Sequence, residues 1–147
     1  MPAQIEPADP RDADALAALL GLVGLPTAGL DEHLGTALVA RDGKEIVGCV
    51  ALELYGPVAL LRSLAVAPSR HGEGLGRRLT RAGLELGRRA GVTRFCLLTT
   101  TAAEFFVRHF GFRPIARDAV PAPVRRSVEF LSACPETAQA MLLATPP

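Results

Sequence analysis

Three glycines stand where a bare backbone could approach a charged ligand closely. Gly72, Gly74 and Gly76 alternate with other residues in the stretch "RHGEGLGRR", after an apolar run and before a helical pattern. Glycine lowers helix stability, so such a cluster at a strand-to-helix junction needs a specific reason. Without Cβ atoms, several N–H groups can turn toward one anion, and the following helix adds the positive end of its dipole. The spacing predicts a phosphate-binding loop, with a turn that is glycine-rich only for packing as the alternative.

The side chains around these glycines narrow the class of phosphate ligand. Arg77, Arg78 and Arg81 carry guanidinium groups that suit phosphate oxygens. A nucleotide-binding P-loop needs a lysine after its last glycine, and none follows here. A dinucleotide fingerprint needs GxGxxG and a later acid, whereas the spacing here is GxGxG and the strand "RFCLLTTT" ends without an acid. Both of these classes fit poorly.

The first half of the chain is predicted to supply strands on one side of this loop. "AQIEPA" is expected to be a short strand, and Asp9-Pro10 is typical of a helix start. The apolar stripe of that helix consists of Leu16, Leu19, Leu20 and Val23, and "GLDEHLGT" predicts a second short helix. Asp42-Gly43 lies between two β-branched runs and predicts a hairpin over "ALVARDGKEIVGCVALELYG". "VALLRSLAVAP" is predicted to be a further strand that Pro68 ends.

The second half alternates between helical and strand patterns. Leu75, Leu79, Ala82 and Leu86 recur at helical spacing after the glycines. "VTRFCLLTTT" predicts a buried strand, "AAEFFVRHF" a short helix and "FRPIA" a strand. We expect a helix through "RRSVEFLSA" and a last strand at "AQAMLLAT", where a helix is the alternative. This alternation indicates an α/β or α+β fold with a mixed sheet.

Composition and charge limit the functional classes. The 147 residues are 49% hydrophobic and 21% charged, which predicts one domain over residues 1–147 with a well-formed core. A net charge of +1 gives no general attraction to nucleic acid. Apolar runs are too short to span a bilayer, and "MPAQIEPADPRDAD" is unlike a signal peptide. Cys49, Cys96 and Cys134 lack metal-ligand spacing and are expected to be reduced thiols, so we expect a cytoplasmic protein without a metal or a membrane partner.

Two segments resemble the GNAT superfamily of N-acetyltransferases. "SLAVAPSRHGEGLGRRLTRAGLELGRRAG" is similar to the strand, pyrophosphate loop and helix of its acetyl-CoA motif, and "FCLLTTTAAEFFVRHFGFRP" to the later strand, helix and strand. The resemblance implies a mixed, mostly antiparallel central sheet flanked by helices, with acetyl-CoA as the co-substrate. Within the superfamily, "RSLAV" and "LLTTTAAEFF" are most similar to N-acetylglutamate synthase-type and arsenic-resistance acetyltransferases, and "RDAVPAPVRRSVEFLSACP" favours the latter group.

The resemblance assigns cofactor-binding roles along this motif. The backbone of Leu64, Ala65 and Val66 would bind the pantetheine arm like an added strand, and the Val66 N–H would polarise the thioester carbonyl. The pyrophosphate would be held by the amides of Gly72, Glu73, Gly74, Leu75, Gly76 and Arg77. His71 stands where the motif has glutamine or arginine; it can still donate a hydrogen bond, or it is a surface residue.

The chain departs from the family where many members carry a proton-donating tyrosine. That position is Val107, or Phe106 if the aromatic pair is aligned instead. Neither side chain can donate a proton, and the tyrosine of the chain, Tyr55, lies in the distant hairpin. General acid–base assistance is worth roughly 10²–10⁴-fold, so its absence would slow the reaction without preventing it.

A base and a substrate anchor are also expected near the thioester. Glu53, Glu104, His109 and Glu129 are candidate bases, and Glu53 is the first choice because its strand is expected to neighbour "LLRSLAV". Arg62 interrupts an apolar strand, and a buried charge needs a partner. A substrate carboxylate would be one partner, and an internal salt bridge to Glu53 is the alternative.

The sequence therefore predicts an acetyl-CoA-dependent N-acetyltransferase for a small amine, an amino acid or an amino-acid-like toxin, with direct transfer. One alternative is a CoA-binding regulatory module without efficient catalysis. Another is an arsenic-binding protein, which would require the three thiols to converge. Monomer and homodimer both stay open.

Overall fold

The predicted hairpin forms the centre of one half of a mixed sheet. In the computed structural model, which describes residues 2–133, 135 and 137–144, β2 (Ala37–Asp42) and β3 (Glu45–Tyr55) are joined at Gly43. Gly43 has a φ of 62°, a left-handed conformation that glycine adopts without strain. On either side of this hairpin, β1 (Gln4–Pro7) pairs antiparallel with β2, and β4 (Val58–Val66) with β3.

The other half of the sheet comes from the C-terminal part of the chain. It contains β5 (Arg94–Thr99), β6 (Arg113–Ile115) and β7 (Gln139–Ala144), and the sheet order is β1-β2-β3-β4-β5-β7-β6. Among the described strands only β4 and β5 run parallel; every other neighbouring pair is antiparallel. The expected mixed, mostly antiparallel sheet is thus confirmed, as is the strand at "AQAMLLAT".

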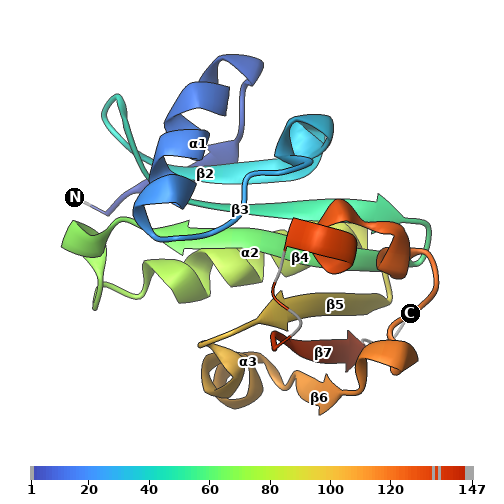
Figure 1. Cartoon of the computed structure of the whole chain (residues 1–147). Helices are drawn as coiled ribbons and strands as arrows, with labels where there is room; N and C mark the ends of the chain where they lie inside the picture. The colour runs from blue at the N-terminus through green and yellow to red at the C-terminus, as the bar shows by residue number, and fades with distance from the viewer. Residues whose placement is uncertain (1, 134, 136, 145–147) are drawn as a thin grey trace.

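The parallel pair at the centre is short. Pairing between β4 and β5 runs only from Val58 opposite Arg94 to Leu60 opposite Cys96. β4 continues to Val66 and β5 to Thr99 without pairing to each other, so the two strands diverge beyond Leu60 (Figure 1). This divergence opens the middle of the sheet at one end.

Helices cover both faces. α2 (Leu75–Arg89) and α3 (Ala103–Phe110) pack with β2–β5 and β7 in one continuous hydrophobic cluster that includes Leu79, Phe95 and Phe106. α1 (Ala13–Leu22) and the 3-10 turn Leu30–Thr36 lie on the opposite side of the sheet from α2 (Figure 1). None of the helices in the described residues is long and apolar enough to cross a membrane.

The α1 face carries two separate hydrophobic clusters. One joins α1 to β2 and β3 and contains Cys49; the other joins β4, β5 and β7 to the C-terminal turns and contains Cys96. Along β4, Leu60 belongs to the second cluster and Ala65 to the first, and the buried charge of Arg62 lies between them in the strand. The two described thiols therefore sit in different clusters, and Cys134 lies outside the described residues.

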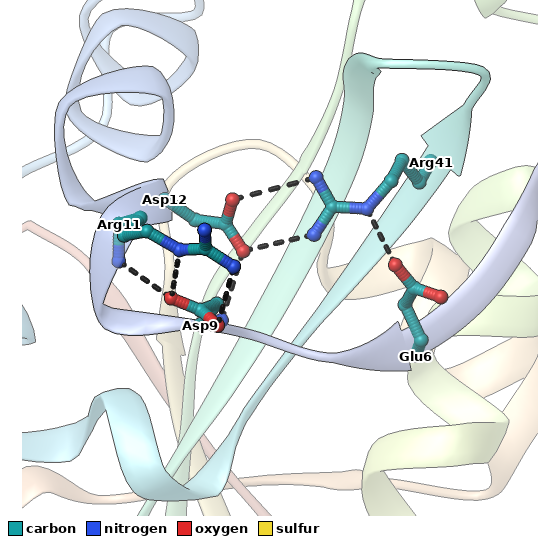
Figure 2. A network of polar contacts seen from close by, with 5 residues as sticks. All are labelled: Glu6, Asp9, Arg11, Asp12 and Arg41. Atoms are coloured by element: carbon teal, nitrogen blue, oxygen red, sulfur yellow. Dashed lines mark hydrogen bonds and ion pairs between the residues drawn. The ribbon is translucent and has the colours of Figure 1, made fainter.

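The predicted helix start at Asp9 is part of a polar network at the β1 edge (Figure 2). Asp9 caps the 3-10 turn Pro10–Asp12, which leads directly into α1. Arg41 of β2 donates from Nε to Glu6 of β1 and from Nη2 to Asp12 at 2.9 Å. Hydrogen bonds from Arg41 and the Asp9 backbone hold the pKa of Asp12 below its ordinary value. The network ties the entry of α1 to the first two strands.

The helix predicted through "RRSVEFLSA" is wrong as a regular helix. The chain forms a 3-10 turn at Val124–Arg126 and a π-helical turn at Glu129–Ala133. Ser127 separates them in an extended conformation (φ −59°, ψ 139°), and its hydroxyl accepts from the N–H of Glu129 at 3.1 Å. Serine offers the backbone this local hydrogen bond in place of the helical one, which explains the break.

Candidate active site

A cleft of about 360 Å³ lies where β4 and β5 diverge. Residues 61–66 of β4 and 97–102 of β5 and the segment after it form its sides. Residues 23–26, which follow α1, complete the lining together with His71, Phe106, and Glu129, Pro135 and Ala138 of the C-terminal segment. Segments from four parts of the sequence thus meet at the opening in the sheet.

The backbone of β4 turns toward this cleft after a bulge. The register with β3 shifts between Cys49 and Ala51, and Ser63 has a φ of 59°, which is unusual for a residue with a Cβ. The N–H of Ala67 donates to Val47 of β3 at 2.8 Å. Since successive residues of a strand point their backbone groups to opposite sides, those of Ala65 also face β3, and those of Val66 and Leu64 face the cleft. This orientation is compatible with the polarising role of the Val66 N–H, which stays a prediction.

His71 lies against the same backbone. Its Nε2 is 3.0 Å from the carbonyl oxygen of Val66, and it lines the cleft. A carbonyl oxygen can only accept, so the ring carries its hydrogen on Nε2 in this contact. The imidazole N–H of His71 therefore donates to the Val66 carbonyl oxygen, and the Val66 N–H is left facing the cleft.

The glycine loop contains two left-handed residues before α2. Gly72 and Gly74 have φ values of 85° and 78°, and nothing lies within 4 Å of a Cβ built on either. Gly74 is the N-cap of α2 without a side-chain cap, so no side chain of its own satisfies the first N–H groups of that helix. Leu75 is buried and anchors the helix start, while Glu73 and Arg77 are exposed. The loop thus presents backbone N–H groups at an open helix N-terminus.

The arginines near the loop divide into two groups. Arg70 pairs with Asp42 and Glu73, and Arg78 donates to the carbonyl of Ala3 at 2.8 Å. Arg77 and Arg81 are exposed on α2. Two guanidinium groups thus tie the loop region to neighbouring segments, and two stand on the surface.

Arg62 lies at the inner end of the cleft in a buried cluster of charges. Its Nη1 donates to Glu53 at 2.8 Å, its Nε to the Ser63 hydroxyl at 3.0 Å, and its Nη2 lies 3.1 Å from Oε2 of Glu129. The side chain is 0% exposed, yet the residue lines the cleft. Nη2 has no partner of good hydrogen-bond geometry among the described residues, so its contact with Glu129 is an ion pair only.

Glu53 stands behind Arg62. Tyr55 donates to its Oε1, and the imidazole of His33 lies 3.7 Å from its Oε2. Burial acts to raise the pKa of Glu53, but hydrogen bonds from Tyr55, Arg62 and Ser127 outweigh it and hold the pKa below the ordinary value. These contacts favour holding Arg62 over accepting a proton. The base role of Glu53 stays a prediction, and Glu129 is the one carboxylate among the described residues that line the cleft.

Comparison with known proteins identifies this architecture. The model of the acetyltransferase (GNAT) domain family matches residues 33–114, which is more than half of the chain. The chain belongs to the GNAT acetyltransferase family. The matched range includes β4, the glycine loop and α2, so the family assignment and the cleft coincide.

Individual relatives of this GNAT chain share its fold. It is 26% identical over 99 residues to an amino-acid acetyltransferase of Neisseria meningitidis, covering 66% of this chain and 22% of that protein. N-acetylglutamate synthase from Neisseria gonorrhoeae, solved with coenzyme A and N-acetyl-glutamate, superposes with a TM-score of 0.83 at 22% identity, covering 99% of this chain and 35% of that one. Rv2747 from Mycobacterium tuberculosis, in complex with CoA and NLQ, superposes with a TM-score of 0.81 at 26% identity, covering 97% and 99%.

The GNAT chain thus spans about a fifth of the length of the curated relative and about a third of the synthase. Similarity to the synthase at this identity establishes the fold of this chain. It does not establish that this chain has the activity of the longer proteins.

The position of the family tyrosine carries no proton donor here. Phe106 is 4% exposed and lines the cleft, with its ring against Phe112, while Val107 is 45% exposed. Tyr55 is committed to Glu53. The other two base candidates, Glu104 and His109, are exposed on α3, where Glu104 pairs with Arg108.

Sequence reasoning missed the contact between Arg62 and Glu129 and the bulge at Ser63. The two charged residues are far apart in the sequence, and no local sequence pattern predicts that they pair. Serine carries no signal for a positive φ, so the bulge also has no sequence mark.

Proposed function

We propose that this chain is an acetyl-CoA-dependent N-acetyltransferase that acetylates the amine of a small amino acid. The observation that carries this proposal is the lining of the cleft, which includes the buried Arg62, the β4 backbone of residues 64–66 and His71, the residue directly before the glycine loop. A cleft between diverging strands can hold an extended thioester on one side and an acceptor on the other. Family membership supports the same reaction class.

The residues present fit acetyl-CoA. Gly72 and Gly74 leave room for phosphate oxygens to approach the N–H groups at the start of α2. The cleft-facing backbone of Leu64 and Val66 can pair with the pantetheine arm as an added strand would. In this proposal the Val66 N–H donates to the thioester carbonyl, where negative charge develops.

Arg62 is the proposed anchor for the acceptor. Arg62 lines the cleft, and its buried Nη2 has no well-aligned acceptor among the described residues, so a substrate carboxylate would supply a charge-assisted hydrogen bond there. Holding the carboxylate fixes the amine near the thioester. The uncharged amine attacks the carbonyl carbon, the C–N bond forms and the C–S bond breaks. The nitrogen loses one proton to water, and water protonates the CoA thiolate because neither Phe106 nor Val107 can.

The test measures release of CoA thiol with acetyl-CoA and each of the twenty L-amino acids, followed by the decarboxylated amines of the best acceptors. We expect turnover of at least one amino acid and poor turnover of its decarboxylated amine. Arg62→Lys keeps the charge but loses the planar fork, so KM for amino acids should rise ten- to a hundredfold, the equivalent of one lost hydrogen bond to a charged group. Arg88→Lys, exposed in the last turn of α2 and away from the glycine loop, is the matched control. Equal rates with and without the carboxylate would show that Arg62 is structural.

A CoA-binding regulatory module is the second candidate. The missing tyrosine favours it, since Phe106 and Val107 cannot protonate the leaving thiolate. Tight binding of acetyl-CoA in calorimetry, without turnover of any amine, would select this alternative.

The finer functional predictions need separate tests. The resemblance to arsenic-resistance acetyltransferases makes amino-acid-like toxins the proposed acceptors, which growth of a sensitive bacterium expressing the chain would test. Cytoplasmic location and a homodimer are further proposals, to be checked by cell fractionation and by sedimentation.

A further inference from the structure

We propose that Glu129 and Arg62 together recognise a zwitterion, with Glu129 binding the ammonium group of the acceptor while Arg62 binds its carboxylate. This inference rests on the proposed function, because it assigns the second charge of the same acceptor site. It concerns recognition of the substrate before its amine loses a proton.

The geometry places the two charges side by side on the cleft. Oε2 of Glu129 lies 3.1 Å from Nη2 of Arg62, and both residues line the cleft. The ammonium and carboxylate of an α-amino acid are attached to the same carbon, so they too are adjacent. A neighbouring guanidinium and carboxylate are therefore complementary to a zwitterion in both charge and spacing.

The charge balance of the cluster favours a cation. Two carboxylates, Glu53 and Glu129, face one guanidinium, and the side chains of all three are at most 7% exposed. The imidazole of His33 lies 3.7 Å from Oε2 of Glu53, the same oxygen that accepts from Nη1 of Arg62. Buried carboxylates are stabilised by neighbouring positive charge, and an acceptor ammonium beside Glu129 would add such a charge to the one that Arg62 supplies.

The local backbone holds Glu129 in place for this role. Ser127 accepts from its N–H, and Glu129 begins a π-helical turn, a conformation frequent at functional sites. Arg117 fixes the same segment: it donates to the carbonyls of Phe130 and Ala138 at 3.3 and 3.2 Å and lies over the Phe130 ring at 4.7 Å. Across the cluster, Gly29 lies so close that a Cβ would be 2.6 Å from Val128 and 3.4 Å from Nη1 of Arg62.

The test uses two probes that differ at one group. L-Glutamate and (S)-2-hydroxyglutarate carry the same carboxylates, but a hydroxyl replaces the ammonium in the second. Calorimetry measures the affinity of the CoA-saturated protein for each probe, and we expect the wild type to bind L-glutamate more tightly. In Glu129→Gln the affinity for L-glutamate should fall ten- to a hundredfold, while that for 2-hydroxyglutarate stays the same. Glu129→Gln leaves Arg62 paired with Glu53, so the fold should persist. Glu129→Asp should restore part of the preference, and Glu85→Gln, on the exposed face of α2, is the control.

The outcomes separate this inference from the proposed function. Equal binding of the two probes by the wild type, or the same preference in Glu129→Gln, overturns the ammonium role, as does an equal loss for both probes. If the wild type nevertheless acetylates amino acids in the turnover panel, only the role of Glu129 fails. If no amino acid is acetylated, the proposed function fails first.

Discussion

Replacing Gly74 by valine is expected to weaken acetyl-CoA binding without unfolding the protein. Gly74 has a φ of 78° and a ψ of 12° at the N-cap of α2, and nothing lies within 4 Å of a Cβ built there. The Cβ of valine would therefore meet no neighbour, and the penalty for this atom comes from the left-handed backbone. That penalty is about 1–2 kcal/mol for a residue with a Cβ, against a total stability of roughly 5–15 kcal/mol for a typical domain.

Gly91 provides a matched control at the opposite end of the same helix. It has a φ of 92° and the same open surroundings, but it lies beyond the C-terminus of α2. Gly91→Val and Gly74→Val should therefore lower the melting temperature alike, by about 2–8 °C for a chain of this size. Only Gly74→Val should affect the ligand, because relaxation of its strain turns an N–H away from the phosphate.

Losing one hydrogen bond to a charged group costs about 1.5–3 kcal/mol, which corresponds to roughly ten- to a hundredfold in the dissociation constant. Calorimetric titration with acetyl-CoA and thermal unfolding by circular dichroism measure the two effects. Unchanged affinity in Gly74→Val, with a melting shift like that of Gly91→Val, would refute anion binding by this loop.

Three further changes test other parts of the structure. Gly87→Ala would place a Cβ 2.4 Å from the buried Phe95 ring and should lower the free energy of unfolding, measured in urea, by about 1–3 kcal/mol. Gly83→Ala, one turn earlier with no neighbour nearer than 3.5 Å, should raise it by up to about 1 kcal/mol. Similar effects of the two substitutions would contradict this packing. Val107→Phe should change kcat by much less than the roughly 10²–10⁴-fold of a general acid, and a larger fall at constant KM would show a proton-transfer role for this position. Burial raises the pKa of the Cys49 thiol to about 12, so iodoacetamide at pH 8 should label it in denaturant but not in the folded protein; mass spectrometry locates the label, and rapid labelling of folded protein would argue against this burial.

Local patterns were sufficient to predict most elements of the fold. The turn at Asp42-Gly43, the apolar stripe of α1 and the glycines before α2 each impose their structure on neighbouring residues, and each element formed where expected. The resemblance to GNAT acetyltransferases then supplied the sheet arrangement that local patterns cannot give. The C-terminal turns differ, because the hydrogen bond from the Glu129 N–H to Ser127 competes with a helix that the apolar spacing alone would allow.

The candidate site was less predictable, since it depends on contacts between distant residues. The sequence left Arg62 with two alternatives, a substrate carboxylate or Glu53. The structure pairs it with Glu53 and adds Glu129, whose approach depends on how the C-terminal segment crosses the sheet. A single arginine in an apolar strand indicates that a partner exists, but it does not indicate which residue that is, because tertiary packing decides the partner.

The three-residue pairing between β4 and β5 affects the local opening of the sheet. The sheet consists of two parts, β1–β4 and β5–β7, and among the described residues β4 and β5 pair only along 58–60 and 94–96, with Pro57 just before them accepting from Thr93 and Arg94. Side-chain packing under α2 holds these parts together, while the strand edges that face the cleft are not paired to each other. Amide protons along those edges are therefore expected to exchange with deuterium ahead of the paired strands. A thioester bound between them would slow exchange on both sides at once, so that the co-substrate unites two half-sheets into a single cooperative unit.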